Sequence, residues 1–321
     1  MIEQLISDNY DFLLDKLELL ESHFGTEISL ARTDKGKYIV KKLPIGIANL
    51  EDEGHITSFL SKHGISVAKL IKTQSDTYVV RTDTFQFTVQ EFVDGITLAV
   101  NTAPGWFLDL SAQTLGKIHT VLKDYGTMKQ SFGMDFFNVA RVSDKEKFLN
   151  QLLISQQAKN DRKLLCETIE QIKHAHRIMG FEIDTKKLTY SNSHGDYYIS
   201  QVITKDRNFT IIDWSSACSL PICNEIIMSY VFADPLCKTG EIDSARLKNY
   251  VEQYAEHSSI SLSKEDLALM PYVFYYHQFM TNYTPPFSNV PESYRAVSKL
   301  INNILNWLYQ YVDSLSAEMS A

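Results

Sequence analysis

The first 95 residues combine two helical and several β-type hydrophobic patterns. Near the N-terminus apolar residues recur at three- and four-residue spacing, which predicts an amphipathic helix. Its apolar side is formed by Ile6, Tyr10, Leu13, Leu17 and Leu20. Two β-type runs then flank a turn sequence at residues 34–36, which predicts a hairpin. Residues 49–64 predict a second helix, with acids in its first turn and a glycine at its end. Residues 77–93 predict two more strands.

Beyond residue 96 the pattern is mostly helical. Helical periodicity covers residues 108–126, 145–179, 245–258 and 294–315. One hairpin interrupts it, with strands on either side of a polar turn at residues 205–208. This layout predicts an α+β fold with two lobes, a small β-rich lobe of residues 1–95 and a larger, mainly helical lobe of residues 96–321. A cleft between two lobes is a frequent place for ligands.

The predicted hairpin brings polar side chains together. If its turn centres on residues 206–207, Gln201 faces Asp213 to within about one residue, because facing positions of antiparallel strands lie about 4.5–5.5 Å apart. Asp196 lies shortly before the first strand. Two carboxylates and an amide at one edge of a sheet offer the oxygen ligands that a divalent hard cation prefers.

Composition narrows the class of protein. The chain has 321 residues, of which 44% are hydrophobic, and a net charge of −8. The absence of a basic stripe argues against nucleic acid as a partner. No run reaches the roughly 18 apolar residues of a membrane span, and the N-terminus lacks the basic region of a signal peptide. The four cysteines form no CxxC pair. We therefore expect a reduced, cytoplasmic protein without membrane or nucleic-acid partners.

The segment around the hairpin resembles the aminoglycoside phosphotransferase and choline kinase-like family, small-molecule kinases that share the protein-kinase fold. That family reads HGDxxxxN, then a short hairpin, then an Asp-Trp metal motif. Here His194 opens "HGDYYISQ", and "IIDW" places Asp213 17 residues after Asp196. The run "YIVKK" resembles the strand of the phosphate-binding lysine, and "TVQEFVDGITL" resembles the hinge strand. The resemblance covers most of residues 25–235 and implies a bilobal protein-kinase-like fold.

The resemblance implies a role for each residue of the central motif. Asp196 would accept the proton of the substrate hydroxyl, and His194 would fix the loop through hydrogen bonds. Asp213 and Gln201 would bind Mg²⁺ that bridges the phosphates of ATP. The reaction would be transfer of the γ-phosphate of ATP to a hydroxyl of a small molecule.

Nucleotide contacts are implied as well. Lys41 would contact the phosphates, held by Glu53 on the following helix. Lys42 is the alternative, since it alternates to the opposite face of the same strand. Backbone groups of Glu91 and Val93 would hydrogen-bond the adenine.

The sequence departs from the family pattern at several places. Gln201 stands where the family has asparagine, and its longer side chain leaves open whether the metal site is weakened, re-formed or lost. An acid is common near the position of Asn224, and Glu225 would take its place. No glycine-rich loop precedes the lysine, so the turn at residues 32–37 would cover the phosphates. His119 is expected to pack or hydrogen-bond within its own helix.

The sequence limits the charge of the acceptor but does not identify the molecule. The aromatic segment 270–295 holds one acid and one base, so we expect an acceptor with at most one positive charge. Acceptor-pocket candidates are Tyr230, Asp234, Tyr275, Tyr276, His277 and Tyr283. The alternative function is a pseudokinase that binds a nucleotide or a partner, and Gln201 keeps it open. A zinc hydrolase is disfavoured because the ligand spacing is wrong for a closed site.

Overall fold

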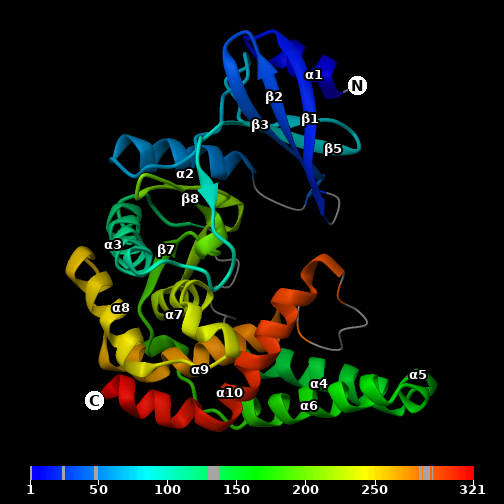
Figure 1. Ribbon diagram of the computed structural model, residues 1–321, viewed down its shortest axis with the longest axis vertical. Coiled ribbons are helices and arrows are strands. Elements are labelled where there is room, and N and C mark those ends of the chain that lie inside the picture. The colour runs from blue at the N-terminus through cyan, green and yellow to red at the C-terminus, as the bar shows by residue number, and fades with distance from the viewer. Residues whose placement is uncertain are drawn as a thin grey trace.

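The computed structural model describes residues 2–23, 26–46, 50–128, 137–281, 284, 290 and 292–321. A five-stranded antiparallel sheet with α1 forms one part, and a mainly helical part lies below it (Figure 1). The predicted α+β class with a small β-rich lobe and a larger helical lobe is therefore confirmed.

The first sheet has the spatial order β1-β2-β3-β5-β4. Its strands are β1 (Leu14–His23), β2 (Thr26–Thr33), β3 (Gly36–Pro44), β4 (Val80–Arg81) and β5 (Phe85–Glu91). The helices α1 (Ile2–Asn9) and α2 (Leu50–Lys62) accompany it. The second part contains α3 (Gly105–Leu122), α4 (Val139–Ile154), α5 (Gln156–Asn160), α6 (Arg162–Met179), α7 (Ile222–Ala233), α8 (Ser244–His257), α9 (Lys264–Met280) and α10 (Arg295–Ser320).

The chain from Leu14 to His23 is a strand, so the predicted N-terminal helix is wrong in its second half. Tyr10 and Phe12 enter a small core under the sheet and end the helical path. β1 then pairs with β2, with two register shifts, and Leu19 and Leu20 stay exposed at the sheet edge. Backbone pairing with β2 outweighs the local helical periodicity, because strand formation depends on the neighbouring strand.

The predicted hairpin of the second part is confirmed as β8 (Val202–Lys205) and β9 (Asn208–Ile211). Val202 faces Ile211, which is the predicted register. Asp206 and Arg207 both have positive φ, as a type I′ turn requires. The structure adds three strands that the sequence did not predict: β6 (Ile96–Thr97) beside β8, and the pair β7 (Tyr190–Ser193) and β10 (Cys218–Pro221).

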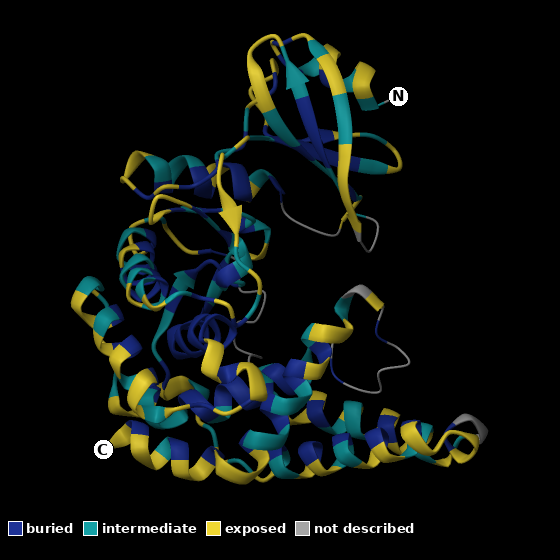
Figure 2. Ribbon diagram, in the orientation of Figure 1, coloured by how far each residue is buried: buried dark blue, intermediate teal, exposed yellow. Residues whose placement is uncertain are grey.

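The helix α7 forms the centre of the larger core. All its residues are buried, and it contacts α3, α8 and α9 (Figure 2). A helix that is apolar all round is stable only when other elements enclose it. Its first turn lies beside the segment that carries the HGD sequence, which makes it a rigid support for the candidate site.

Contacts between the two parts begin close to the hinge. The first sheet ends at Glu91, whereas β6 pairs with β8 of the second part. Val67 forms a parallel bridge to Ile211, so β9 also touches the first part. The lobe boundary at residues 95 and 96 stays a prediction. Within the described ranges, no helix has the length and apolar character needed to cross a membrane.

Candidate active site

Lys41 points from β3 toward the second part of the chain. Its Nζ lies 2.5 Å from Asp213 Oδ1 and 3.4 Å from Ser215 Oγ. Lys42 points to the other face, where its Nζ pairs with Glu27 at 3.0 Å and lies 5.0 Å from the centre of the Phe85 ring. Of the two alternatives, only Lys41 reaches the aspartate of the Asp-Trp motif.

Glu53 lies in the same region but is not the ion-pair partner of Lys41. Its buried carboxylate accepts a hydrogen bond from the backbone N–H of Trp214 at 3.1 Å. Among the described residues, Lys41 pairs with Asp213 instead, and Glu53 Oε2 has no hydrogen-bond partner. Burial raises the pKa of Glu53 to about 7, and the charge of Lys41 opposes that rise. The expected lysine–glutamate pair is thus replaced in this structure by a lysine–aspartate pair.

The HGD segment is held by its own histidine. His194 is fully buried, its Nε2 donates to the carbonyl of Ile212 at 2.9 Å, and its Nδ1 accepts from the N–H of Asp196 at 3.3 Å. These two contacts define a neutral ring protonated at Nε2. Burial lowers the pKa of His194, which keeps the ring neutral. His194 therefore occupies the loop-fixing position that the sequence predicted for it.

Gly195 permits the tight backbone of this loop. Its φ is +84°, and a Cβ atom there would lie 2.1 Å from the carbonyl oxygen of Ser216. Only glycine fits both the left-handed conformation and this close approach. The loop can therefore lie directly against the segment that follows Asp213.

Asp196 and Gln201 are in contact. The pKa of Asp196 is raised to about 8 by burial first, and then by the negative charges of Asp213 and Glu225. A side-chain hydrogen bond from Gln201 opposes that rise. The carbonyl of Gln201 also accepts from the N–H of Ile212 at 3.0 Å, one residue before Asp213. The structure thus brings Asp196, Gln201 and Asp213 together, as the hairpin register predicts.

The site has an excess of negative charge that suits a cation. The carboxylates of Glu53, Asp213 and Asp196 act on one ammonium, that of Lys41, and raise its pKa although burial opposes this. Asp213 also adopts a left-handed backbone, with φ 59°, shortly after the end of β9. In the described part of the chain, no three His, Cys, Asp or Glu side chains are grouped to ligate a metal. A divalent cation held by Asp196 and Asp213 would need further oxygen ligands from Gln201, a substrate or water.

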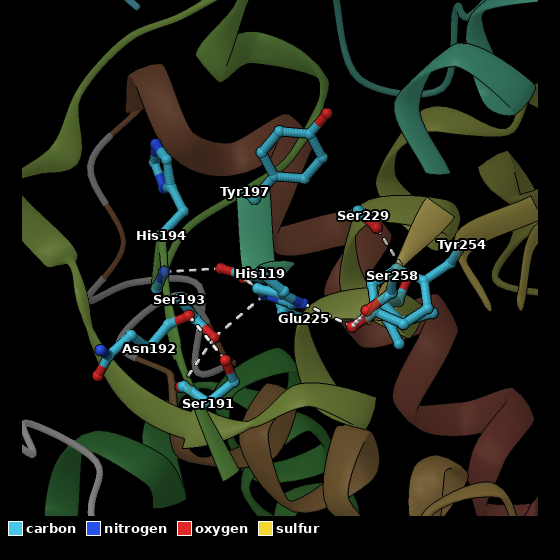
Figure 3. Close-up of polar contacts among 12 residues, drawn as sticks. His119, Ser191, Asn192, Ser193, His194, Tyr197, Glu225, Ser229, Tyr254 and Ser258 are labelled. Atoms are coloured by element: carbon cyan, nitrogen blue, oxygen red, sulfur yellow. Dashed lines mark hydrogen bonds and ion pairs between the residues drawn. The ribbon is translucent and has the colours of Figure 1, made fainter. Parts of the chain in front are cut away.

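A buried network supports the HGD loop from behind (Figure 3). Glu225 Oε1 accepts from the N–H of Gly195 at 2.6 Å, and Glu225 Oε2 lies 2.8 Å from His119 Nε2. His119 Nδ1 lies 2.8 Å from the hydroxyl of Tyr254, and Ser193 Oγ lies 3.2 Å from His119 Nε2. Although burial opposes it, the hydrogen bond from His119 lowers the pKa of Glu225. His119 therefore joins α3 to α7 and α8, and its expected role within one helix is wrong.

The hinge segment leaves backbone groups exposed to the interlobe side. The N–H of Glu91 donates to the carbonyl of Lys69 at 2.9 Å, and the Glu91 side chain pairs with Lys69 Nζ at 3.0 Å. Val93 makes no backbone hydrogen bond with any described residue. The backbone groups of Val93 could therefore hydrogen-bond an adenine ring at the hinge. The N–H of Glu91 could not, because it already donates to Lys69.

The turn at residues 32–37 is not near Lys41. It joins β2 to β3 at the end of the sheet where Thr33 faces Gly36, whereas Lys41 faces Ile28 near the other end of β3. The expectation that this turn covers the phosphates is therefore wrong. The turn at Lys41's end joins β1 to β2, and its residues 24 and 25 lie outside the described residues. Taking β1 for a helix concealed this turn.

Two of the acceptor candidates belong to the core, and the others differ in their surroundings. Asp234 is buried and pairs with Arg246 at 2.7 Å, and the Tyr275 hydroxyl lies 2.6 Å from His174 Nδ1, so both belong to the core. Tyr276 packs on Phe137, with 4.7 Å between ring centres. The remaining candidates were Tyr230, which is buried, His277, whose Nδ1 lies 3.2 Å from Asn224 Nδ2, and Tyr283, which lies outside the described residues.

Comparisons with known proteins identify the fold. No family model and no curated protein matches the sequence. Among solved structures, an amicoumacin kinase in complex with AMP-PNP, Ca²⁺ and its antibiotic aligns at 15% identity with a TM-score of 0.61, over 97% of each chain. An aminoglycoside phosphotransferase from Alicyclobacillus acidocaldarius aligns at 16% identity with a TM-score of 0.57, over 98% of this chain and 97% of the other.

A choline kinase from Cryptosporidium parvum aligns at 11% identity with a TM-score of 0.57, over 99% of this chain and 95% of the other. The chain therefore has the bilobal fold of the small-molecule kinases. Within that class, the fold confirms the resemblance to aminoglycoside phosphotransferases and choline kinase along nearly the whole chain.

Proposed function

We propose that this protein is an ATP- and Mg²⁺-dependent phosphotransferase that moves the γ-phosphate to a hydroxyl of a small molecule. The observation that carries the proposal is the convergence of Lys41, Asp196 and Asp213 at one place between the two parts of the chain. Residues 1–95 form the nucleotide-binding lobe of this proposal, and residues 96–321 form the catalytic and acceptor-binding lobe. The buried free thiols of Cys218, Cys223 and Cys237 support a cytoplasmic location.

Each residue has a task that its surroundings support. Asp196, with a pKa raised to about 8, accepts the proton of the acceptor hydroxyl and orients that hydroxyl for attack. Lys41 neutralises phosphate oxygens once it leaves Asp213. Asp213 and Gln201 would hold Mg²⁺, which neutralises phosphate charge when bound. The carbonyl of Glu91 and the backbone of Val93 bind the adenine.

The acceptor is proposed to carry at most one positive charge. The segment 270–295 is rich in aromatic residues and holds one acid and one base, and aromatic walls suit a neutral ring or a single cation. A polycationic acceptor needs several carboxylates to replace the solvation of its ammonium groups. Steady-state kinetics on aminoglycosides and neutral sugars would decide the point, and efficient turnover of a tetracationic aminoglycoside would contradict it.

A pseudokinase is the second candidate function. The observation that favours it is Gln201, which stands where the family has asparagine and interacts with the carboxyl group of the proposed base, Asp196. In that case the protein binds nucleotide and transfers no phosphate.

Thermal unfolding with and without MgATP tests the nucleotide site. We expect stabilisation at millimolar MgATP, and we expect Asp213→Ala to remove its magnesium-dependent part, because the carboxylate at the candidate metal site is gone. Asp83→Ala, at an exposed residue of the first lobe, is the matched control and should keep the full stabilisation. Identical unfolding temperatures with and without MgATP would rule out the kinase and the nucleotide-binding form of the pseudokinase.

Phosphate transfer by the wild type separates the kinase from the pseudokinase, and Asp196→Asn then tests the base. With an acceptor that the wild type phosphorylates, this variant should bind MgATP normally and lose roughly 10²–10⁴-fold in rate, since only the base is removed. Unchanged turnover would show that Asp196 is not the base.

A further inference from the structure

Lys145, on the second turn of α4, is a half-buried cation without an acidic partner among the described residues. Among the described residues no carboxylate lies within ion-pair distance of its Nζ. Burial alone lowers its pKa to about 7. Desolvating an unpaired ammonium is costly, so such a group is rarely retained for stability.

The contacts of Lys145 hold its ammonium at the end of α9. Nζ donates to the carbonyl of Phe279, in the last turn of that helix, and to Thr284 Oγ1 at 2.7 Å. It also lies 4.4 Å from the centre of the Phe279 ring. An ammonium has three donors, and the described residues accept from two of them. The third donor therefore has no acceptor among the described residues, and a ligand that accepts from it would also favour the charged form of the amine.

The charged neighbours of Lys145 are already paired elsewhere. Asp144 pairs with Lys147 at 3.0 Å on the exposed side of α4. Glu146 lies 2.8 Å from His176 Nε2, on α6. Neither carboxylate turns toward Lys145, so the charge of this lysine is uncompensated within the described chain.

Lys145 and the candidate catalytic loop are connected through α9 and α7, partly by hydrogen bonds and partly by positions close in sequence. Phe279 follows His277 on α9 by two residues, and His277 contacts Asn224 at the start of α7. The next residue of α7, Glu225, accepts from the N–H of Gly195. The ammonium thus lies at the end of α9 that also carries the acceptor candidates.

We infer that the acceptor of this enzyme carries an acidic group, a carboxylate or a phosphate, that pairs with Lys145 at the end of α9. The inference rests on the proposed function and narrows it to acceptors that join a hydroxyl to an anionic group. An anion completes the third hydrogen bond of the ammonium and restores its charge balance in a poorly solvated place. A zwitterion such as a hydroxy amino acid also meets the limit of one positive charge.

Matched acceptors that differ only in the acidic group test the inference. The probes are L-homoserine against 3-amino-1-propanol, gluconate against glucitol, and glucose 6-phosphate against glucose. The first two pairs report a carboxylate and the third a phosphate. Binding is measured by thermal shift with MgADP and without nucleotide, and phosphate transfer is measured with MgATP. At least one acidic probe should bind about tenfold or more tightly than its neutral partner.

Three variants assign that preference to the charge of Lys145. Lys145→Met removes charge and hydrogen bonds, and Lys145→Gln keeps a donor for the carbonyl of Phe279 but removes the charge. Both should lose the preference for the acidic probe. Lys147→Met, an exposed neighbour on the same helix, should keep it. If Lys145 only joins α4 to α9, the glutamine variant behaves as the wild type and the methionine variant weakens both probes of a pair equally.

The outcomes separate this inference from the proposed function. Equal binding of acidic and neutral probes, or a preference that survives both Lys145 variants, overturns the inference. The inference is also overturned if MgATP stabilises the protein but no acidic probe does. Absence of any MgATP effect instead refutes the proposed function, and binding of the probes without nucleotide still decides whether Lys145 holds an anion.

Discussion

At the scale of single residues, the departure at Gln201 acquires a physical meaning. The sequence predicts an amide close to Asp213, and the structure places this amide close enough to Asp196 to lower the pKa of that carboxyl group. The longer side chain therefore spans the distance from the hairpin to the HGD loop. Register could be predicted because the turn fixes it. The contact with Asp196 could not, since it depends on the path of a loop whose partners lie far along the chain.

Replacing Gln201 should move the pH dependence of the reaction. The hydrogen bond from Gln201 stabilises the charged form of Asp196 and so lowers its pKa. Gln201→Ala removes that bond, and we expect the rising limb of kcat/KM against pH to shift to higher pH. A higher Mg²⁺ concentration for half-maximal activity should accompany it, whereas Gln201→Asn should be tolerated. Gln310→Ala, on the exposed face of α10, is the control. A profile unchanged in Gln201→Ala would contradict the assignment.

Glu53 should make the ligand-free protein less stable as pH rises. Its pKa is about 7 in the folded state and near 4.5 in the unfolded chain, so the folded state binds more protons between those values. Stability is therefore lost as pH increases from about 4.5 to 7. Glu53→Gln lacks this contribution. Urea unfolding at pH 5, 6, 7 and 8 should show the variant gaining stability relative to the wild type up to about pH 7 and then levelling. A constant difference would refute the prediction.

At the scale of elements, the strand β1 is the main difference between the predicted and the observed first lobe. β1 has helical spacing of apolar residues, and only its pairing with β2 makes it a strand. Because this spacing predicts a helix, the sequence indicates no turn before Thr26. The only turn that it predicts ahead of Lys41 is the one at residues 32–37. The pair β7 and β10 was not predicted because its strands lie far apart in the chain and no turn sequence joins them, whereas the equally short β8 and β9 flank a polar turn.

Glu225 on α7 holds the HGD loop in place. It accepts from the N–H of Gly195 and contacts His119 on α3, which in turn contacts Tyr254 on α8. Glu225→Ala leaves the N–H of Gly195 and the ring of His119 without their buried acceptor. We expect a loss of about 3–5 kcal/mol in the free energy of unfolding. Urea denaturation checks this, with Glu252→Ala on the exposed side of α8 as the control. A loss below about 1 kcal/mol would show that water or a neighbouring group replaces the carboxylate.

At the scale of the whole molecule, the two lobes are joined by more than the hinge. The N–H of Ile211 donates to the carbonyl of Ser66 at 3.0 Å, and its carbonyl accepts from Ala68 at 3.1 Å. α2 contacts α3 and the segment after Asp213. Calorimetry of the ligand-free protein should therefore show a single transition, with equal calorimetric and van 't Hoff enthalpies. Two separated transitions would mean that these contacts do not couple the lobes.

The order of motifs along the chain was enough to predict the two-lobe plan, because strand, helix, hinge and hairpin follow one another with distinct periodicities. The sequence also placed Lys41, Asp196 and Asp213 on elements that meet. It did not predict that Lys41 pairs with Asp213 rather than Glu53, since that choice depends on side chains from distant elements.

The pairing of Lys41 with Asp213 has a consequence for the order of binding. In the ligand-free protein the ammonium already satisfies the carboxylate that a metal would need. A free divalent ion must therefore compete with a covalently tethered cation, whereas a nucleotide supplies phosphates that draw Lys41 away. The metal should accordingly enter together with the nucleotide, and the resting enzyme should remain indifferent to changes in free magnesium.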